Sequence, residues 1–433
     1  MSFLTPELLT RFDVSGPRYT SYPTADRFVE AFSQKDVLQT LGQRQHGIGQ
    51  KSWPLSIYVH IPFCASRCGY CDFNTYTAAE LQRDGTSITA ATYPDRVVAE
   101  VNWLRNDQAS DERKLSTVFF GGGTPTLIDS KELVRILQSL ESNYGFTDDI
   151  EVTTEANPDS VTLQDLETLR AGGFTRVSFG HQSSAANVLA LLERTHTPGK
   201  TWQAVSDARS AGFEHVSVDL IYGSPGETDT DLAETLDQVS AADVDHVSAY
   251  SLIVEPGTRL AARVARGEVP NPSDDVAAHR YELIDAKLQS LGMTWYEVSN
   301  WAKPGGECRH NIAYWRNQDW LGIGPGAHAH SAGTRSWNLK HPAAWAAKVD
   351  DGVSAIADSE VLAAEDVKHE DIMLGLRLRE GLALTSLGEA GLTQAELAVS
   401  EGLLVPQEFA NGKAVLTFQG RLLADGLVAR LWA

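Results

Sequence analysis

Cysteine is scarce in this chain of 433 residues, which contains only four. So few thiols exclude a disulfide-stapled secreted scaffold. Basic residues are also in deficit, because 36 Lys and Arg stand against 57 Asp and Glu and the net charge is −21. A field of that sign repels phosphate, and it argues against nucleic acid or an anionic membrane as a general partner.

Long apolar runs are missing as well. No stretch approaches the roughly 20 consecutive apolar residues that span a bilayer. The first residues, MSFLTPELLTRFD, lack the basic-then-apolar pattern of a secretory signal. These absences predict a cytoplasmic protein without a transmembrane segment, and a hydrophobic content of 42% is enough for a large core.

What is present is an alternation of strand-like and helical segments. In the helical pattern Thr230–Ala241, for example, Leu232, Leu236 and Val239 share one face. Such alternation predicts parallel strands with crossover helices. We therefore predict an α/β fold with a partial (β/α)6 barrel of the TIM type, and an open doubly wound sheet is the alternative. The predicted strands are Leu55–Ile61, Leu115–Phe120, Asp149–Thr154, Arg176–Phe179, His215–Ile221 and Val244–Leu252.

The segments outside this alternation set the expected domain boundaries. Residues 1–50 form an irregular, aromatic-bearing arm, and residues 51–270 form the barrel. Residues 271–360 form a connecting region that begins with a helix from about Ser273 to Leu291. Residues 361–433 are similar to a small winged-helix domain and give the C-terminal region an α+β character. In so acidic a chain, we interpret that domain as a packing module.

Three of the four cysteines lie close together after the first predicted strand. Cys64, Cys68 and Cys71 have the spacing C-x₃-C-x₂-C. Thiolates suit iron–sulfur clusters and zinc. Structural zinc normally takes four ligands, and the chain has no second C-x₂-C pair. The pattern therefore favours a cubane cluster with one open iron. The alternatives are three free thiols, or zinc with His60 or Cys308 as its fourth ligand.

Glycine and acidic residues stand where several of the predicted strands end. In a βα barrel, ligand-binding residues lie at the carboxyl ends of the strands. The string Gly121–Thr126 follows the second strand and lets the backbone approach a ligand. Glu155 ends the third strand, and Asp219 lies within the apolar fifth strand. A carboxylate at such a position is costly unless it is paired or binds a ligand, so a structural salt bridge is the alternative for either acid.

The cysteine spacing after a first barrel strand resembles the signature of the radical S-adenosylmethionine (SAM) superfamily. The resemblance implies a [4Fe–4S] cluster held by Cys64, Cys68 and Cys71, with SAM bound to the open iron. It also implies a radical SAM barrel and, where radical chemistry occurs, an electron donor such as flavodoxin.

Within that superfamily the chain is similar to the coproporphyrinogen dehydrogenase-like group. This likeness implies that Arg194 meets the carboxylate of SAM, and that Asp219 or Glu155 meets its hydroxyls or amine. The group usually has Phe at the Tyr70 position and Ala at the Ile253 position. The implied cofactor contacts are Tyr58, Tyr70, Gly122, Gly123, Thr124, Glu155, Gln182, Arg194, Asp219 and Ile253.

Two branches of the group differ just after the cysteines. The oxygen-independent coproporphyrinogen III dehydrogenase (HemN) carries a further Cys two residues past the third, where this chain has Phe73. The form C-x₃-C-x₂-C-D-F resembles the HemW branch, whose members act as haem chaperones. A second HemW-like string, H-N-x-x-Y-W, implies haem binding by Cys308, His310, Asn311, Tyr314 and Trp315. Against this, about the first sixty residues are similar to the dehydrogenase.

These likenesses imply a haem chaperone that binds haem, the cluster and SAM and delivers haem to acceptor proteins. The alternative is the dehydrogenase, which converts propionates to vinyl groups by radical oxidative decarboxylation in porphyrin biosynthesis. We assign no catalytic residue.

Overall fold

The structure is a computed structural model that describes residues 53–84, 86–107, 111–195 and 197–432. The arm expected over residues 1–50 lies outside the described residues. Every predicted strand is present, and the six lie side by side and parallel, in the order of the sequence. They are β1 (Leu55–Ile61), β4 (Leu115–Gly122), β5 (Phe146–Ala156), β6 (Arg176–Gln182), β7 (His215–Tyr222) and β8 (His246–Ser251).

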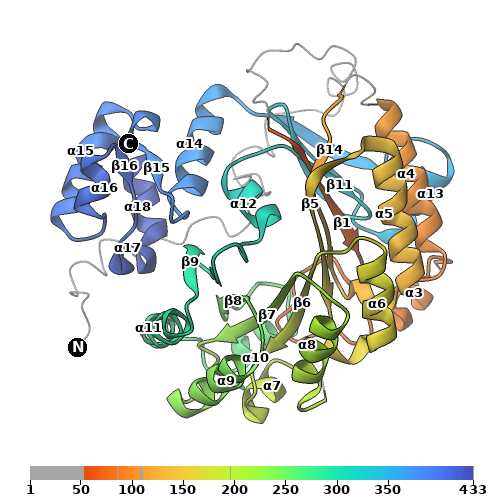
Figure 1. The fold of residues 1–433 in the computed structure, drawn as a ribbon, viewed down its shortest axis with the longest axis horizontal. Helices are drawn as coiled ribbons and strands as arrows, with labels where there is room; N and C mark the ends of the chain where they lie inside the picture. The colour runs from red at the N-terminus through yellow and green to blue at the C-terminus, as the bar shows by residue number, and fades with distance from the viewer. Residues whose placement is uncertain (1–52, 85, 108–110, 196, 433) are drawn as a thin grey trace.

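Crossover helices cover the outer face of these strands (Figure 1). The predicted helix Thr230–Ala241 is α9 (Asp229–Ala241), and its Leu232, Leu236 and Val239 are buried as expected. Thr228 caps it by accepting from the Asp231 N–H. The other main helices on this face are α4 (Tyr93–Asp107), α5 (Ser130–Tyr144), α6 (Leu163–Ala171) and α8 (Lys200–Ser210).

Six further strands widen the sheet at both edges to 12 strands. Beside β1 lies the parallel strand β11 (Trp320–Ile323), followed by antiparallel β12 (His328–Ser331), β13 (Thr334–Asn338) and β14 (Ile356–Val361). Beside β8 lie antiparallel β10 (Asn300–Ala302) and β9 (Thr294–Glu297). A doubly wound sheet reverses its strand order at a switch point. The order β1-β4-β5-β6-β7-β8 has no such reversal, and the predicted partial barrel is confirmed.

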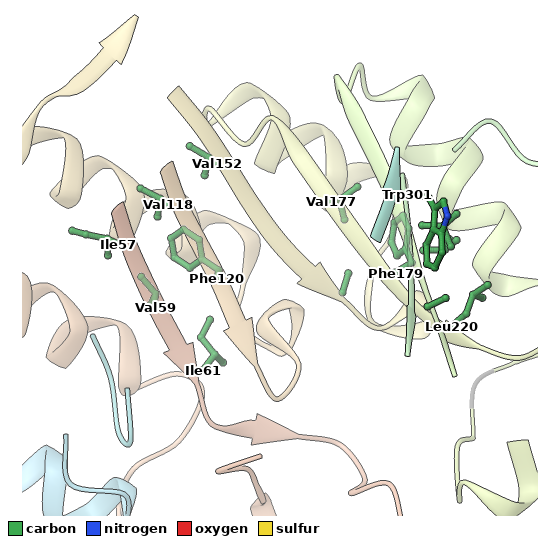
Figure 2. Close-up of a cluster of buried hydrophobic side chains, with 14 of the residues drawn as sticks. Ile57, Val59, Ile61, Val118, Phe120, Val152, Val177, Phe179, Leu220 and Trp301 are labelled. Atoms are coloured by element: carbon green, nitrogen blue, oxygen red, sulfur yellow. The ribbon is translucent and has the colours of Figure 1, made fainter. Parts of the chain in front are cut away.

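The main core lies between the strands and their helices. Figure 2 shows Ile57, Val59, Val118 and Phe120 of β1 and β4 within this apolar cluster. All four side chains are 0% exposed. Each contributes about 1.5–3 kcal/mol of burial free energy, which holds the strands in register and fixes where their carboxyl ends meet.

The C-terminal residues form a helical unit with one short two-stranded sheet. The unit packs against the barrel through Arg421, whose Nη2 lies 2.8 Å from the Asp285 carboxylate on α11 (Asp274–Ser290). No helix in the described ranges has both the length and the apolar character needed to cross a membrane. The elements of the unit are α14 (Ala364–Gly375), β15 (Leu382–Ala383), α15 (Glu389–Ser400), α16 (Pro406–Ala410), β16 (Lys413–Ala414), α17 (Phe418–Leu422) and α18 (Ala424–Leu431).

Candidate functional site

The cysteine loop lies at the carboxyl ends of the parallel strands, an end of the barrel that we call the mouth. Cys64 ends the short strand β2 (Phe63–Cys64), and Cys68 and Cys71 follow it. All three thiols are partly exposed. Burial and the nearby Cys71 raise the pKa of Cys64 to about 11, and burial raises the pKa of Cys71. Cys64 and Cys71 therefore need a cationic centre to become thiolates at neutral pH.

Arg194 brings positive charge to this loop. Its Nη1 lies 3.7 Å from Sγ of Cys68, and its Nη2 donates to the Gly180 carbonyl over 2.7 Å. Its Nε is buried and has no hydrogen-bond partner in the described part of the chain. One N–H of the guanidinium thus stays available, which suits a carboxylate ligand.

The glycine string after β4 packs directly against the cysteine loop. Gly122 has a φ of 113°, which side chains disfavour. A Cβ on Gly123 would lie 2.4 Å from the Phe63 carbonyl oxygen and 3.1 Å from Sγ of Cys64. The N–H of Thr124 donates to that same Phe63 oxygen over 2.7 Å. The close approach of the two backbones therefore requires glycine.

Glu155 and Asp219 lie on the inner face of the barrel. Glu155 accepts from the Gly122 N–H over 3.1 Å, and Asp219 accepts from the Ser178 hydroxyl over 3.0 Å. Burial and the charge of Asp219 raise the pKa of Glu155 to about 8, and burial raises the pKa of Asp219 to about 6. Neither carboxylate forms an ion pair with any described residue, so the salt-bridge alternative is not realised. Two unpaired acids in one barrel are typical of a ligand site.

Two more of the predicted cofactor contacts, Tyr58 and Tyr70, lie close to residues of this site. The pKa of Tyr58 is raised by burial and by Glu155, and that of Tyr70 by burial and by Cys68. Gln182 has a φ of 68°, a left-handed conformation that is uncommon outside glycine and frequent at functional sites. Ile253 follows β8 and is 36% exposed. The barrel thus gathers the predicted contacts from six strands.

Tyr250 was missed in the sequence. Asp219 pairs in register with Ser248, and alternation along β8 puts Tyr250 on the same inner face. Its side chain is 47% exposed although it lies within the sheet. The period-two pattern Ser248, Tyr250 was the available signal.

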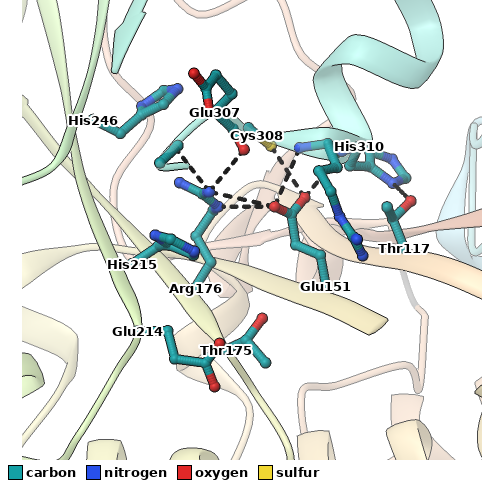
Figure 3. Close-up of polar contacts among 12 residues, drawn as sticks. Thr117, Glu151, Thr175, Arg176, Glu214, His215, His246, Glu307, Cys308 and His310 are labelled. Atoms are coloured by element: carbon teal, nitrogen blue, oxygen red, sulfur yellow. Dashed lines mark hydrogen bonds and ion pairs between the residues drawn. The ribbon is translucent and has the colours of Figure 1, made fainter. Parts of the chain in front are cut away.

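The predicted haem motif forms α12 (Arg309–Trp315), at the opposite end of the inner surface. Its contacts with Thr117 and Glu151, together with the bonds of Arg176 to the residues just before it, form a cluster that we call the floor (Figure 3). The Glu151 carboxylate accepts from the N–H groups of Arg309 (3.1 Å) and His310 (3.0 Å). Buried Arg176 lies 3.3 Å from Glu151 and donates to the Gly306 and Glu307 carbonyls. This ion pair holds the start of α12 against the strands.

His310 and Cys308 are buried in the floor. The Nδ1 of His310 lies 2.7 Å from the Thr117 hydroxyl, and its Nε2 lies 3.0 Å from the Tyr314 hydroxyl. Burial lowers the pKa of His310 to about 4, so the ring is neutral at pH 7. The thiol of Cys308 lies 3.6 Å from Glu151, and burial and this carboxylate raise its pKa to about 12. Both candidate iron ligands are engaged within the protein.

The rest of the motif is held less tightly. Asn311 donates to the Tyr296 hydroxyl over 3.3 Å. The Trp315 ring lies 5.9 Å from the Arg377 guanidinium, and its Nε1 has no described partner. Both ring nitrogens of His310 are therefore hydrogen-bonded, whereas Nε1 of Trp315 has no described hydrogen-bond partner.

The zinc alternatives lack a fourth ligand. Cys308 bonds to Glu151 at the floor. Glu151 lies four residues before Glu155 on β5, a distance of roughly 13 Å along the strand from the mouth. His60 is occupied, with Nε2 2.9 Å from the Asn74 carbonyl and Nδ1 3.0 Å from the Tyr58 hydroxyl. No group of three or more His, Cys, Asp or Glu among the described residues is arranged to hold a single metal ion.

Comparison with known proteins places this arrangement in a family. Residues 58–239 match the model of the radical SAM superfamily. The chain is also 48% identical over 380 residues to a heme chaperone HemW from Mycobacterium tuberculosis, an alignment that covers 87% of this chain and 95% of that protein. The chain belongs to the HemW family of radical SAM proteins.

Two further matches agree with this assignment. The heme chaperone HemW of Bacillus subtilis is 32% identical over 379 residues, 86% of this chain and 97% of that protein. Among solved structures, coproporphyrinogen III oxidase (HemN) from Escherichia coli, a radical SAM enzyme, aligns with a TM-score of 0.78 and 26% identity. That alignment covers 96% of each chain, and the described part of the HemW-family chain shares its fold with HemN.

The residues at the mouth fit the cofactors that a HemW-family protein implies. The three thiols provide the donor set of a [4Fe–4S] cluster with one open iron. The free N–H of Arg194 and the acids Glu155 and Asp219, which form no ion pair with a described residue, provide a cation and two carboxyl groups for a zwitterionic ligand such as SAM. Glycine at 122 and 123 lets the end of β4 and the segment after it pack directly against His60 and the cysteine loop, where a Cβ would collide.

Proposed function

We propose that this protein is a haem chaperone that binds haem and delivers it to haem-requiring acceptor proteins in the cytoplasm. The observation that carries the proposal is the 48% identity, over most of both chains, to a protein named as a heme chaperone. Phe73 supports it, because this exposed side chain stands where the dehydrogenase has a further cysteine.

The cofactor roles follow from the mouth. Cys64, Cys68 and Cys71 would hold a [4Fe–4S] cluster, and Arg194 would bind the carboxylate of SAM. The cluster, when bound, supplies an open iron and a one-electron centre. The part of the protein is to exclude bulk water and to place charges, with Glu155 and Asp219 facing the cationic portion of SAM.

Haem would bind in the region from Cys308 to Trp315. Ligation of iron by His310 requires that its bond to Thr117 or Tyr314 be broken, because both ring nitrogens are engaged. The neutral imidazole that burial favours is the form that ligates a metal. The buried thiol of Cys308 first has to lose its proton.

A titration with haemin tests the chaperone proposal. Wild-type protein is expected to give a saturable Soret band and to transfer haem to an added apo-haemoprotein. The Cys308→Ala/His310→Ala variant is expected to change the band. The absence of any saturable haemin binding by the wild type would contradict the proposed function, whereas an unchanged band in the variant would remove only these two ligands.

A second candidate function is coproporphyrinogen III oxidative decarboxylation. The structural match to HemN over 96% of both chains favours it. An anaerobic assay of the reconstituted protein with coproporphyrinogen III, SAM and reduced flavodoxin distinguishes the two functions. Formation of protoporphyrinogen above the level of a Cys68→Ala control would establish the enzyme and displace the chaperone proposal.

A further inference from the structure

A cavity borders the motif helix on the side away from His310. Its volume is about 310 Å³, and its lining residues are Tyr296, Ile312, Arg316, Leu378, Arg379 and Glu380. Residues 310 and 314 face the strands, whereas 312 lies on the opposite side of the helix, at 100° per residue. The cavity therefore opens where α12, the edge strand β9 and the turn after α14 meet. Its lining residues Tyr296 and Ile312 pack in one buried cluster with Cys308 of the floor.

The lining combines an apolar base with two guanidinium groups. Tyr296 and Leu378 are 8% and 3% exposed and form the buried part. Arg316 is bidentate to Glu380, with distances of 2.8 Å and 2.6 Å to its two oxygens. The side chain of Arg379 forms no ion pair with any described residue, while its backbone N–H donates to the Tyr296 carbonyl. Two arginines against one glutamate give this apolar cavity a net positive charge, in a chain whose own net charge is −21.

We propose that this cavity binds the carboxylate-bearing edge of a tetrapyrrole, with its propionates on Arg316 and Arg379. The proposal rests on the proposed haem function and adds a binding surface and a ligand edge to it. A flat, apolar ring with two carboxylates matches an apolar base with two guanidinium groups, because guanidinium binds carboxylate bidentately.

The size of the cavity limits how much of the ring it encloses. Pockets that enclose small ligands run from about 300 to 1,000 Å³, and this one lies at the lower end. It therefore takes one edge and leaves the remainder of the macrocycle accessible, which suits a protein that must pass its cargo on.

Replacing Glu380 distinguishes ligand binding at Arg316 from a purely structural role of the ion pair. Its carboxylate occupies Arg316, and this hydrogen-bonded pairing lowers the pKa of Glu380. A propionate must compete with that carboxylate for the same donors. Removing Glu380 should therefore tighten ligand binding, although it breaks an ion pair.

The test uses the full chain with haemin and with protoporphyrin IX, compared with their dimethyl esters. Arg316→Ala and Arg379→Ala are each expected to weaken binding of the diacids about tenfold, and Glu380→Gln to tighten it several-fold. The wild-type preference for diacid over diester should disappear in the double arginine variant. Arg96→Ala and Asp350→Asn, from an ion pair of 2.9 Å between α4 and α13 (Pro342–Asp350), serve as matched controls and should change nothing.

The outcomes separate this inference from the function on which it rests. If wild type binds haemin but the arginine variants bind as tightly and Glu380→Gln does not tighten binding, the cavity is not the propionate site and the chaperone proposal stands. If wild type binds neither haemin nor protoporphyrin IX, the proposed function fails and this inference fails with it.

Discussion

Two glutamates four residues apart on β5 have opposite surroundings. Glu151 lies at the floor, where it accepts from two backbone N–H groups and pairs with buried Arg176. Glu155 lies at the mouth, where it has one backbone donor and a like-charged neighbour in Asp219. Glu151 is thus paired with a positive charge, whereas Glu155 lies beside a second acid and forms no ion pair with a described residue.

This difference suits a structural role for the floor and a ligand-binding role for the mouth. Buried charges that are paired hold a segment in place, as Glu151 and Arg176 hold the start of α12, although Nη1 of Arg176 has no described hydrogen-bond partner. Buried charges that lack a partner cost stability, and they persist where a ligand supplies the missing partner. We therefore expect the floor to keep its structure without a ligand, and the mouth to be stabilised when a ligand binds there.

The largest expected effect is on the iron content of the protein, and it should differ between a cysteine of the mouth and the cysteine of the floor. Cys68→Ala should abolish cluster incorporation, because two thiolates do not hold a cubane, whereas Cys308→Ala should leave iron content unchanged. Iron and sulfide analysis after anaerobic reconstitution, with the absorbance near 400 nm, measures both. Retention of full iron and sulfide by Cys68→Ala, or loss by Cys308→Ala, would reverse the roles of the two ends.

The second prediction compares the two glutamates directly. Glu151→Gln leaves Arg176 buried without a counter-charge, and the expected loss is about 3–5 kcal/mol of unfolding free energy. Glu155→Gln removes a buried acid whose ionised form is disfavoured by burial and by Asp219, and should leave the unfolding free energy unchanged or raise it. Urea unfolding of the cluster-free proteins at pH 7.5 measures both values. Similar losses in the two variants would mean that the mouth is as fully paired as the floor.

The apolar strands and amphipathic helices of the barrel were predictable from the sequence. β1 occupies the predicted span, Leu55–Ile61, and α9 differs from its predicted span by one residue. These elements follow local rules, since a strand buried on both faces is a continuous apolar run and a surface helix has one apolar face. The segment from Trp295 to Gly326 gave little signal. Its strands β9, β10 and β11 are three or four residues long and join the sheet through non-local pairing that periodicity does not reveal.

The candidate site divides in the same way. The cysteines, Glu155 and Asp219 could be placed at the mouth because the carboxyl ends of parallel strands meet there. The sequence did not reveal that Glu151 and Arg176 pair, or that His310 has both ring nitrogens engaged. The contacts of His310 with Thr117 and Glu151, and of Arg176 with Gly306, join residues more than a hundred positions apart. They depend on where α12 packs, which no local pattern specifies.

The third prediction concerns the pH dependence of stability that Glu155 at the mouth contributes. The folded-state pKa of Glu155, about 8, lies above its ordinary value of 4.5. The folded protein thus binds this proton more tightly than the unfolded chain, and stability is lost as pH rises from about 4.5 through 8. The cluster-free protein should lose on the order of 2 kcal/mol between pH 5.5 and 8. The loss should be smaller in the Glu155→Gln variant. An equal dependence of the unfolding free energy on pH in both proteins would contradict this prediction.

The smallest expected effect concerns how firmly the mouth is attached. Asn74 Nδ2 donates to the Pro325 carbonyl over 3.0 Å and to the Lys340 carbonyl over 2.8 Å, which ties the cysteine loop to a distant turn. Asn74→Ala should cost about 1 kcal/mol of global stability, because these bonds are partly exposed and water replaces them. Hydrogen exchange of residues 64–77 should nevertheless accelerate, while exchange in α12 stays unchanged. Asn143→Ala, which removes the exposed bond to Asn102, is the control and should leave both regions unaffected. A loss above about 3 kcal/mol would mean that the cysteine loop is held as rigidly as the floor, since costs of that size come from buried and fully engaged groups.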